Sequence, residues 1–303
     1  MITKNGLLVI FLLLVLFGVA GCTVSGVGTN ADDKREYSGY FSKPKVLGRI
    51  SDPKIDESSG LAVSPCQKNV FWTHNDSGSG AEIFAIDQTG RTLGRFTVAG
   101  ATNTDWEDIA IYKSPKGECF LYIGDFGNNA KMRSEHKIYK VREPLAANKG
   151  GATERATMIR FSYPDINHDA EAILVAPGEK IYVITKSVSF PAGVYRIDSK
   201  TGKAELKGRI SVPSLPNGLI TGADVTADGK RVVVCDYFGA YEYALSDNAK
   251  DFDEIWKSKP KLIDAGKREQ GEAVAYSPDG MKIYLTSEKA RSPLIEVARK
   301  RKG

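Results

Sequence analysis

Apolar runs of strand length recur along the chain, each behind a short acidic segment. Five copies of this segment begin roughly 50 residues apart, which is the period of four-stranded propeller blades. They are ESSGLAV (57–63), DWEDIAI (105–111), DAEAILV (169–175), TGADV (221–225) and QGEAVAY (270–276). Because one such blade cannot bury its faces alone, we expect the copies to stack around an axis and share a core.

A second and a third strand are predicted behind each acidic segment. The second strands are VFWTHND (70–76), CFLYIGD (119–125), KIYVITK (180–186), RVVVCD (231–236) and KIYLTSE (282–288). The third strands are AEIFAID, HKIYKVRE, GVYRID, AYEYAL and PLIEV. Aromatic and β-branched residues bounded by Gly, Asp and Pro are typical of strands, and no helical period of comparable length occurs.

The outermost strand indicates how the ring closes. LGRFT (93–97) and KGRIS (207–211) are similar to each other, whereas the fifth copy ends soon after Val297 without such a strand. A third version, LGRIS (47–51), precedes the first copy. We therefore expect this N-terminal strand to complete the last blade of an all-β propeller and to join the two ends of the ring.

The pattern also sets the domain boundaries. We expect a propeller over 44–298 and a basic tail over 299–303, either solvated or in contact with anionic lipid head groups. Five blades are favoured, and six remain open if 145–164 or 213–220 contains a degenerate blade.

The first 22 residues resemble the export segment of bacterial lipoproteins. Lys4 precedes an apolar stretch, 7–17, that is too short for a stable transmembrane span, and VAGC (19–22) follows as a lipobox. The resemblance implies a signal peptide over 1–21 and acyl chains on Cys22 that anchor the chain to a membrane. An uncleaved anchor helix is the alternative.

The segment behind Cys22 predicts a location in the bacterial cell envelope. Residues 22–43 are polar and rich in glycine, which is typical of a flexible tether outside the cytoplasm. By the same resemblance, Thr23 in place of an aspartate favours the outer membrane of a Gram-negative cell.

Composition agrees with a folded body and argues against nucleic acid as a partner. The hydrophobic fraction is 42%, the charged fraction 26%, and the formal net charge only +5. No basic stripe lies within the repeats, as a nucleic-acid footprint would require.

An acidic ring is predicted at one mouth of the central channel. On a strand, residues two positions apart share a face. The residues two and four positions before the apolar core position of each first strand therefore form two columns on the same side, near the channel. They are Ser59, Glu107, Glu171, Ala223 and Glu272, and, two residues earlier, Glu57, Asp105, Asp169, Thr221 and Gln270. Asp224 is one position out of register, which an extra turn or bulge would repair.

The second strands return to the same mouth because the pairing is antiparallel. Their aligned ends, together with one histidine, are the predicted ligand-binding residues: His74, Asp76, Asp125, Lys186, Asp236 and Glu288. Loops 73–82 and 124–133 follow two of these strands and are expected to project over the mouth. Cationic donors lie beside the acidic ring, a mixture suited to a phosphate and a metal: His74, Lys131, Arg133, Lys186 and Arg291.

Carboxylates this close together either raise one another's pKa or bind a cation. Oxygen ligands without a Cys or His cluster suit calcium or magnesium, and calcium tolerates irregular geometry better. The predicted metal ligands are Ser59, Glu107, Glu171, Asp224 and Glu272. Hydrogen bonding of these side chains to neighbouring backbone, or a catalytic acid–base role, remains the alternative.

Other chemistries find little support in the sequence. The three histidines lie in separate blades without metal-ligand spacing, which argues against zinc. No phosphate-binding loop, dinucleotide fingerprint or nucleophile elbow is present. In an exported protein, Cys66 and Cys119, at the same end of consecutive blades, either form a disulfide or remain two free thiols, and Cys235 is expected to be a free thiol in the core.

The segments DWEDIA, GDFGNN, DAEAIL and QGEAVAYSPDG resemble secreted β-propellers of the phytase-like esterase and SdiA-regulated families. More loosely, the chain resembles calcium-activated apyrase, which implies a five-bladed ring with a central calcium. Two functions follow as alternatives: an anchored propeller that binds an unknown small ligand or protein, which we favour, or a metal-dependent phosphoester hydrolase.

Overall fold

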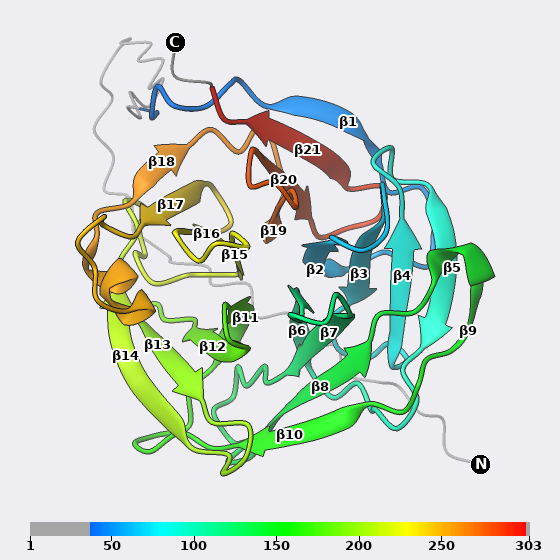
Figure 1. The fold of residues 1–303 in the computed structure, drawn as a ribbon, viewed down its shortest axis with the longest axis horizontal. Helices are drawn as coiled ribbons and strands as arrows, with labels where there is room; N and C mark the ends of the chain where they lie inside the picture. Colours follow the sequence, from blue (N-terminus) through cyan, green and yellow to red (C-terminus); the bar gives the residue numbers. More distant parts are fainter. Residues whose placement is uncertain (1–36, 301–303) are drawn as a thin grey trace, which may run out of the picture. The chain divides into compact units, whose positions relative to one another are not determined.

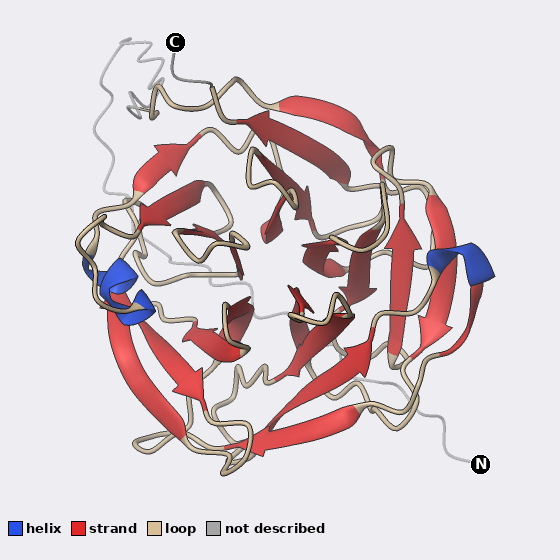
Figure 2. Cartoon of the chain, in the orientation of Figure 1, coloured by secondary structure: helices blue, strands red, loops and turns tan. Residues whose placement is uncertain are grey.

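The computed structural model describes residues 37–300, and these form a five-bladed β-propeller (Figures 1 and 2). The predicted signal peptide, Cys22 and most of the predicted tether lie outside the described residues. The described residues form one compact unit. No helix among the described residues is long and apolar enough to cross a membrane.

Each blade is an antiparallel four-stranded sheet whose first strand lies innermost (Figure 1). Blade 1 contains β2 (Ser58–Val63), β3 (Phe71–Asn75), β4 (Glu82–Ile86) and β5 (Thr92–Thr97); blade 2 contains β6 (Trp106–Lys113), β7 (Cys119–Asp125), β8 (His136–Arg142) and β10 (Thr157–Phe161). Blade 3 contains β11 (Ala170–Ala176), β12 (Lys180–Thr185), β13 (Ala192–Ile197) and β14 (Ala204–Ile210). Blade 4 contains β15 (Gly222–Val225), β16 (Arg231–Cys235), β17 (Ala240–Ala244) and β18 (Lys261–Ile263), and blade 5 contains β19 (Gly271–Tyr276), β20 (Lys282–Ser287), β21 (Pro293–Ala298) and β1 (Lys45–Arg49).

The N-terminal strand closes the ring, as the sequence predicts. Strand β1 pairs antiparallel with β21, with Lys45 opposite Glu296, so the two ends of the chain share one blade. This pairing removes the open edge that blade 5 would otherwise present.

No sixth blade is present among the described residues. Segment 145–164 contains the 3-10 turn η1 (Ala146–Asn148), the short strand β9 (Gly150–Ala152) and β10. β9 adds to the outer edge of blade 1 in parallel with β5, and β10 is the outer strand of blade 2. Segment 213–220 contains no strand, and the helix η2 (Phe252–Lys257) lies between β17 and β18.

The core consists of apolar layers between neighbouring blades. Strand β11 is buried along its whole length because both of its faces contact other blades. A strand buried on both faces reads as a continuous apolar run, which explains AILVA at 172–176. Each fully buried Ile, Leu or Val contributes about 1.5–3 kcal/mol, so these layers hold the inner strands in place.

Both ends of the propeller pack more closely than the sequence predicts. Phe41 is buried, and Ser42 exchanges hydrogen bonds with Ala298, so the last residues of the predicted tether belong to the folded body. Arg299, predicted as part of a solvated basic tail, forms an ion pair with the buried Glu242 and lies over the Phe41 ring. The prediction that Arg299 is solvated is therefore wrong: its guanidinium compensates the charge of the buried Glu242 carboxylate.

Candidate functional site

Four of the five innermost strands bulge where they begin. The ladder register shifts at Ser59 in β2, at Glu171 in β11, and beside Glu107 and Glu272 in β6 and β19. A bulge leaves a residue unpaired and re-aims its side chain. The carboxylates of Glu107 and Glu272 both interact with that of Glu171, so the ring brings the three glutamates together.

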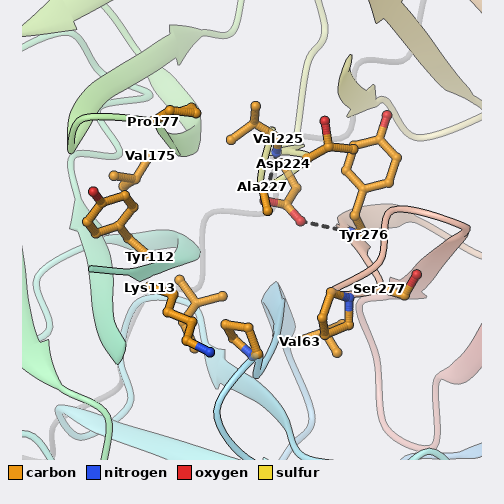
Figure 3. A pocket seen from close by; sticks show the side chains of 14 residues that line it. Val63, Tyr112, Lys113, Val175, Pro177, Asp224, Val225, Ala227, Tyr276 and Ser277 are labelled. Atoms are coloured by element: carbon orange, nitrogen blue, oxygen red, sulfur yellow. Dashed lines mark hydrogen bonds between the residues drawn. The ribbon is translucent and has the colours of Figure 1, made fainter. Parts of the chain in front are cut away.

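Blade 4 does not bulge, and Asp224 therefore does not join this group. Strand β15 pairs in regular register, with Asp224 opposite Val233. The Asp224 carboxylate accepts hydrogen bonds from the backbone N–H groups of Val225 (2.8 Å) and Tyr276 (2.7 Å) and lines a cavity at the opposite end of the strands (Figure 3). The predicted bulge was placed in the wrong blade, since the other four blades carry it.

Eight carboxyl groups gather at the mouth where the innermost strands begin, and the pKa of each is raised. They are Glu57, Asp76, Asp105, Glu107, Asp169, Glu171, Glu272 and Glu288. Burial is the main cause and neighbouring carboxylates add to it, raising the pKa of Asp105 to about 6 and that of Glu288 to about 7. We call these eight residues the acidic mouth.

One cation compensates part of this charge. Lys186 forms an ion pair with Glu171 and lies 5.3 Å from the centre of the Tyr237 ring. Although burial alone would lower it, the Glu171 carboxylate raises the pKa of Lys186, so the lysine stays charged. Burial nevertheless raises the pKa of Glu171 to about 8. A single ammonium group therefore does not neutralise the mouth.

Several other carboxylates already have hydrogen-bond donors. The side-chain amide of Gln270 donates to Glu272 (2.8 Å) and to Glu288 (2.5 Å). The Asp169 carboxylate accepts the backbone N–H of Asn128 at 2.8 Å. These three groups are thus held by protein donors.

Asp76, Asp105 and Glu107 form the one group of mouth carboxylates close enough to share an ion among the described residues. One oxygen from each lies within 4.8 Å of the others. The side-chain oxygens of Asp105 and Glu107 accept no hydrogen bond from the described part of the chain, although Glu107 is only 5% exposed. A buried carboxylate beside a half-buried one, neither of which accepts a hydrogen bond, needs a counter-ion or protons.

Gly127 completes the wall beside these two carboxylates. A Cβ added to Gly127 would overlap Glu107 Oε1 and Asp105 Oδ2. The guanidinium of Arg133 holds the loop, donating to the Gly127 carbonyl (2.9 Å) and to Asp125 Oδ1 (2.9 Å). The loop predicted to project over the mouth thus brings its backbone close to the carboxylate oxygens.

Ser59 and His74 lie away from the mouth's open side. Ser59 Oγ donates to the backbone carbonyl of Glu107 at 2.6 Å and joins blade 1 to blade 2. His74 is completely buried against Trp106, with Nδ1 3.0 Å from the Asn75 carbonyl, and burial lowers its pKa to about 4. Neither is placed to bind a ligand, because each is enclosed by neighbouring strands.

Asp125 and Asp236 are also enclosed. Asp125 is fully buried and forms an ion pair with Arg133. Gly127, not Asp125, takes the position that Asp76 holds in blade 1, because the backbone N–H of each donates to the carbonyl of the residue before the first strand of its blade. Asp236 accepts hydrogen bonds from its own turn at Phe238 and Gly239. The predicted alignment fails here because the loops after the second strands differ in length and conformation.

Asp108 is a central residue that sequence analysis did not identify. Its carboxylate accepts backbone N–H groups from Ile109 (2.8 Å), Ile173 (3.0 Å) and Ala223 (3.3 Å), which belong to three different blades. Strand parity alone places it away from Glu107, so only the bulge explains how both residues face the axis. Asp108 therefore ties the blades together beneath the mouth.

The opposite end of the same strands is mainly apolar. A cavity of about 300 Å³ is lined by one segment from each blade, including Val63, Tyr112, Val175, Val225 and Tyr276 (Figure 3). The disulfide considered from the sequence also lies on this side: Cys66 and Cys119 are bonded, with Sγ atoms 2.14 Å apart, and Cys235 is a buried free thiol.

Comparison with known proteins supports the fold alone. No protein-family model matches the chain, and no curated protein matches it in sequence. Three solved structures are similar: an aldose sugar dehydrogenase of Streptomyces coelicolor with bound PQQ (TM-score 0.50, 12% identity, 87% of this chain and 100% of that chain), a glucose dehydrogenase (0.50, 9%, 86% and 100%) and a streptogramin B lyase (0.48, 11%, 87% and 100%). The likeness to the two dehydrogenases supports a β-propeller and gives no support to the esterase, SdiA-regulated or apyrase resemblances.

Proposed function

We propose that this protein is a ligand-binding propeller whose acidic mouth holds a divalent cation at Asp76, Asp105 and Glu107. The observation that carries the proposal is the meeting of three carboxylate oxygens within 4.8 Å, two of them from groups without a protein donor. A cation there would relieve the repulsion that raises these pKa values and would leave its outward side to a ligand.

Calcium is the ion that best suits this set of ligands. All three groups supply oxygen, one from blade 1 and two from blade 2, and calcium tolerates the irregular geometry that such a mixed set gives. The only other group of metal-ligating residues in the described part of the chain is Cys66, Cys119 and Glu143, whose cysteines are already bonded to each other. A thiolate metal is therefore a poor candidate.

Calorimetric titration of calcium into metal-free protein tests this proposal. We expect one bound ion per chain in the wild type, and a loss of binding in Glu107→Gln, which keeps the shape of the side chain and removes its charge. Elemental analysis of the protein as purified provides a second readout. If the wild type binds no calcium and carries no metal, the mouth is a structural element only.

We also propose that the chain is held at a membrane of the bacterial envelope through acylated Cys22. The support is the lipobox VAGC at 19–22. Cys22→Ala should move the protein out of the detergent-rich phase in phase separation, or leave the signal peptide uncleaved. Equal partitioning of the wild type and a variant whose mass shows that residues 1–21 are removed would contradict the anchor.

A metal-dependent phosphoester hydrolase is the second candidate function. The observation in its favour is Glu288, a mouth carboxylate whose pKa, at about 7, suits a general base near neutral pH. A panel of phosphoesters assayed with and without calcium separates the two functions. Calcium binding without hydrolysis of any substrate supports the binding propeller.

A further inference from the structure

A second, basic cavity lies at the edge of blade 5. It has a volume of about 510 Å³ and is formed by the end of β1, the segment before β19 and the loop between β20 and β21. Its cationic side chains are Arg49, Lys267, Arg268, Lys289 and Arg291. Glu288, a member of the acidic mouth, also lines this cavity, so the two sites adjoin. The net charge of the cavity is nevertheless positive.

The positive charge of this cavity is largely uncompensated. Five cationic groups face two carboxylates, Glu269 and Glu288, which leaves a formal charge of +3 (5 − 2). The one ion pair among these residues joins Lys289 to Glu269 at 3.4 Å, and both side chains are largely exposed. Such an exposed pair contributes little, so the cavity attracts anions.

Three buried donor atoms on two side chains of the cavity wall have no protein acceptor. Ser292, only 4% exposed, forms no hydrogen bond through Oγ with any described residue, and neither do Nε and Nη1 of Arg268. The remaining nitrogen, Nη2, donates to the carbonyls of Asp236 (3.2 Å) and Gly239 (3.1 Å), which fixes the guanidinium in place. Buried donors without acceptors are costly, and a bound anion would satisfy them.

The loop that carries two of the cations is held in a strained conformation. Lys289 and Arg291 have φ angles of 77° and 61°, a region that side-chain-bearing residues rarely adopt. Arg49 donates to the Arg291 carbonyl at 3.1 Å and holds the loop against β1. Strain of this kind is often kept where it positions side chains for a ligand.

We infer that this cavity binds an oxyanion of the phosphate class carrying two or more negative charges. Its lining supplies donors and positive charge in excess, and the planar guanidinium of arginine matches the oxygens of such a group. The inference goes beyond the cation site, because none of these contacts needs a metal. A free phosphorylated molecule and a lipid phosphate offer the same chemistry.

The test measures binding of inorganic phosphate to the full-length protein in detergent micelles, by calorimetry at low ionic strength. Metal is removed with a chelating resin, because soluble chelators are themselves polyanions. The variants are Lys267→Gln and Arg291→Asn, since asparagine tolerates a positive φ. Lys116→Gln, an exposed lysine in the hairpin between β6 and β7, is the matched control.

We expect each variant to weaken phosphate binding about tenfold, the effect of one lost charge-assisted hydrogen bond, and the control to bind like the wild type. A parallel arm replaces inorganic phosphate in the micelles with phosphatidic acid, a lipid phosphomonoester that can carry two negative charges. A response to phosphatidic acid alone, lost in both variants, identifies the oxyanion as a lipid head group and supports the inference. Binding of neither probe, or equal binding by the wild type and both variants, overturns it.

Discussion

The two ends of the central channel are built from the same five strands and have opposite chemistry. Where the strands begin, eight carboxyl groups with raised pKa values surround the ion-paired Lys186, and Arg133 and Lys289 act on single members of the group. Where they end, valine, proline and tyrosine side chains line a cavity with one carboxylate, Asp224 (Figure 3). The apolar end is therefore stable by packing alone, whereas the acidic end requires protons, Lys186 or an added cation.

The difference arises from backbone geometry as much as from composition. Bulges at the start of β2, β6, β11 and β19 re-aim side chains that a regular ladder would turn into the blades. β15 lacks a bulge, and its carboxylate accordingly lies at the other end. The acidic mouth is therefore formed by irregular strand starts, whereas the apolar end follows from regular strand pairing.

The largest expected effect concerns the apolar end. Replacing both Cys66 and Cys119 with serine opens a link of 53 residues and should lower the free energy of unfolding by about 4 kcal/mol. Urea unfolding with and without calcium measures it, and the loss should be the same in both because the acidic mouth is distant. A reduced wild type as stable as the oxidised protein would contradict the prediction.

The next effect concerns the acidic end. Gly127→Ala places a methyl group against Asp105 and Glu107 and should abolish stabilisation by calcium, which is about 2.7 kcal/mol at a hundredfold excess over Kd. Thermal melting in calcium and in chelator measures the shift. Gly39→Ala is the matched control, because a methyl group there meets no atom within 4 Å. A Gly127→Ala variant that keeps the full calcium shift would rule out the assigned position.

The pH dependence should also separate the two ends. A carboxyl group whose folded-state pKa is raised stabilises the fold below its unfolded pKa, near 4, and that contribution is lost as pH rises through the folded value. With folded values of about 6 for Asp105, 7 for Glu288 and 8 for Glu171, the metal-free protein should lose stability between pH 5 and 8.

Calcium should reverse most of this loss, because it binds the deprotonated carboxylates. Tm followed across this range should fall by about 2–4 °C for each kcal/mol lost without calcium, and by less with it. A metal-free Tm that rises over the same range would contradict the raised pKa values.

The smallest effect is expected from Asp224→Asn. Burial raises the pKa of Asp224 to about 7, so this variant should flatten the pH dependence of stability near neutrality. The shift in Tm on adding calcium should stay that of the wild type, because Asp224 lies at the apolar end. Loss of the calcium-induced Tm shift in this variant would mean that Asp224 belongs to the cation site, and would contradict the proposed difference between the two ends.

The sequence predicts the architecture well because blade repeats and strand patterning are local signals. The order of strands, the closure by 47–51 and the clustering of Glu107, Glu171 and Glu272 could all be read from spacing. The enclosure of Asp125 and Asp236 could not, because it depends on how each loop folds back on its own strand. The basic cavity could be read only in part: Arg291 is expected among the cationic donors and Arg49 in the closing strand, but the loop conformation that brings them together at Arg268 and Ser292 has no sequence signal.

The most direct test of the acidic mouth uses terbium, which replaces calcium and emits when a nearby tryptophan is excited. Trp106 begins β6 beside Asp105 and Glu107, whereas tyrosines, not tryptophans, line the apolar end. Excitation through tryptophan should give terbium emission in the wild type and in Asp224→Asn, displaced by excess calcium and absent in Glu107→Gln. No emission from the wild type, or equal emission from Glu107→Gln, would contradict a cation site at this mouth.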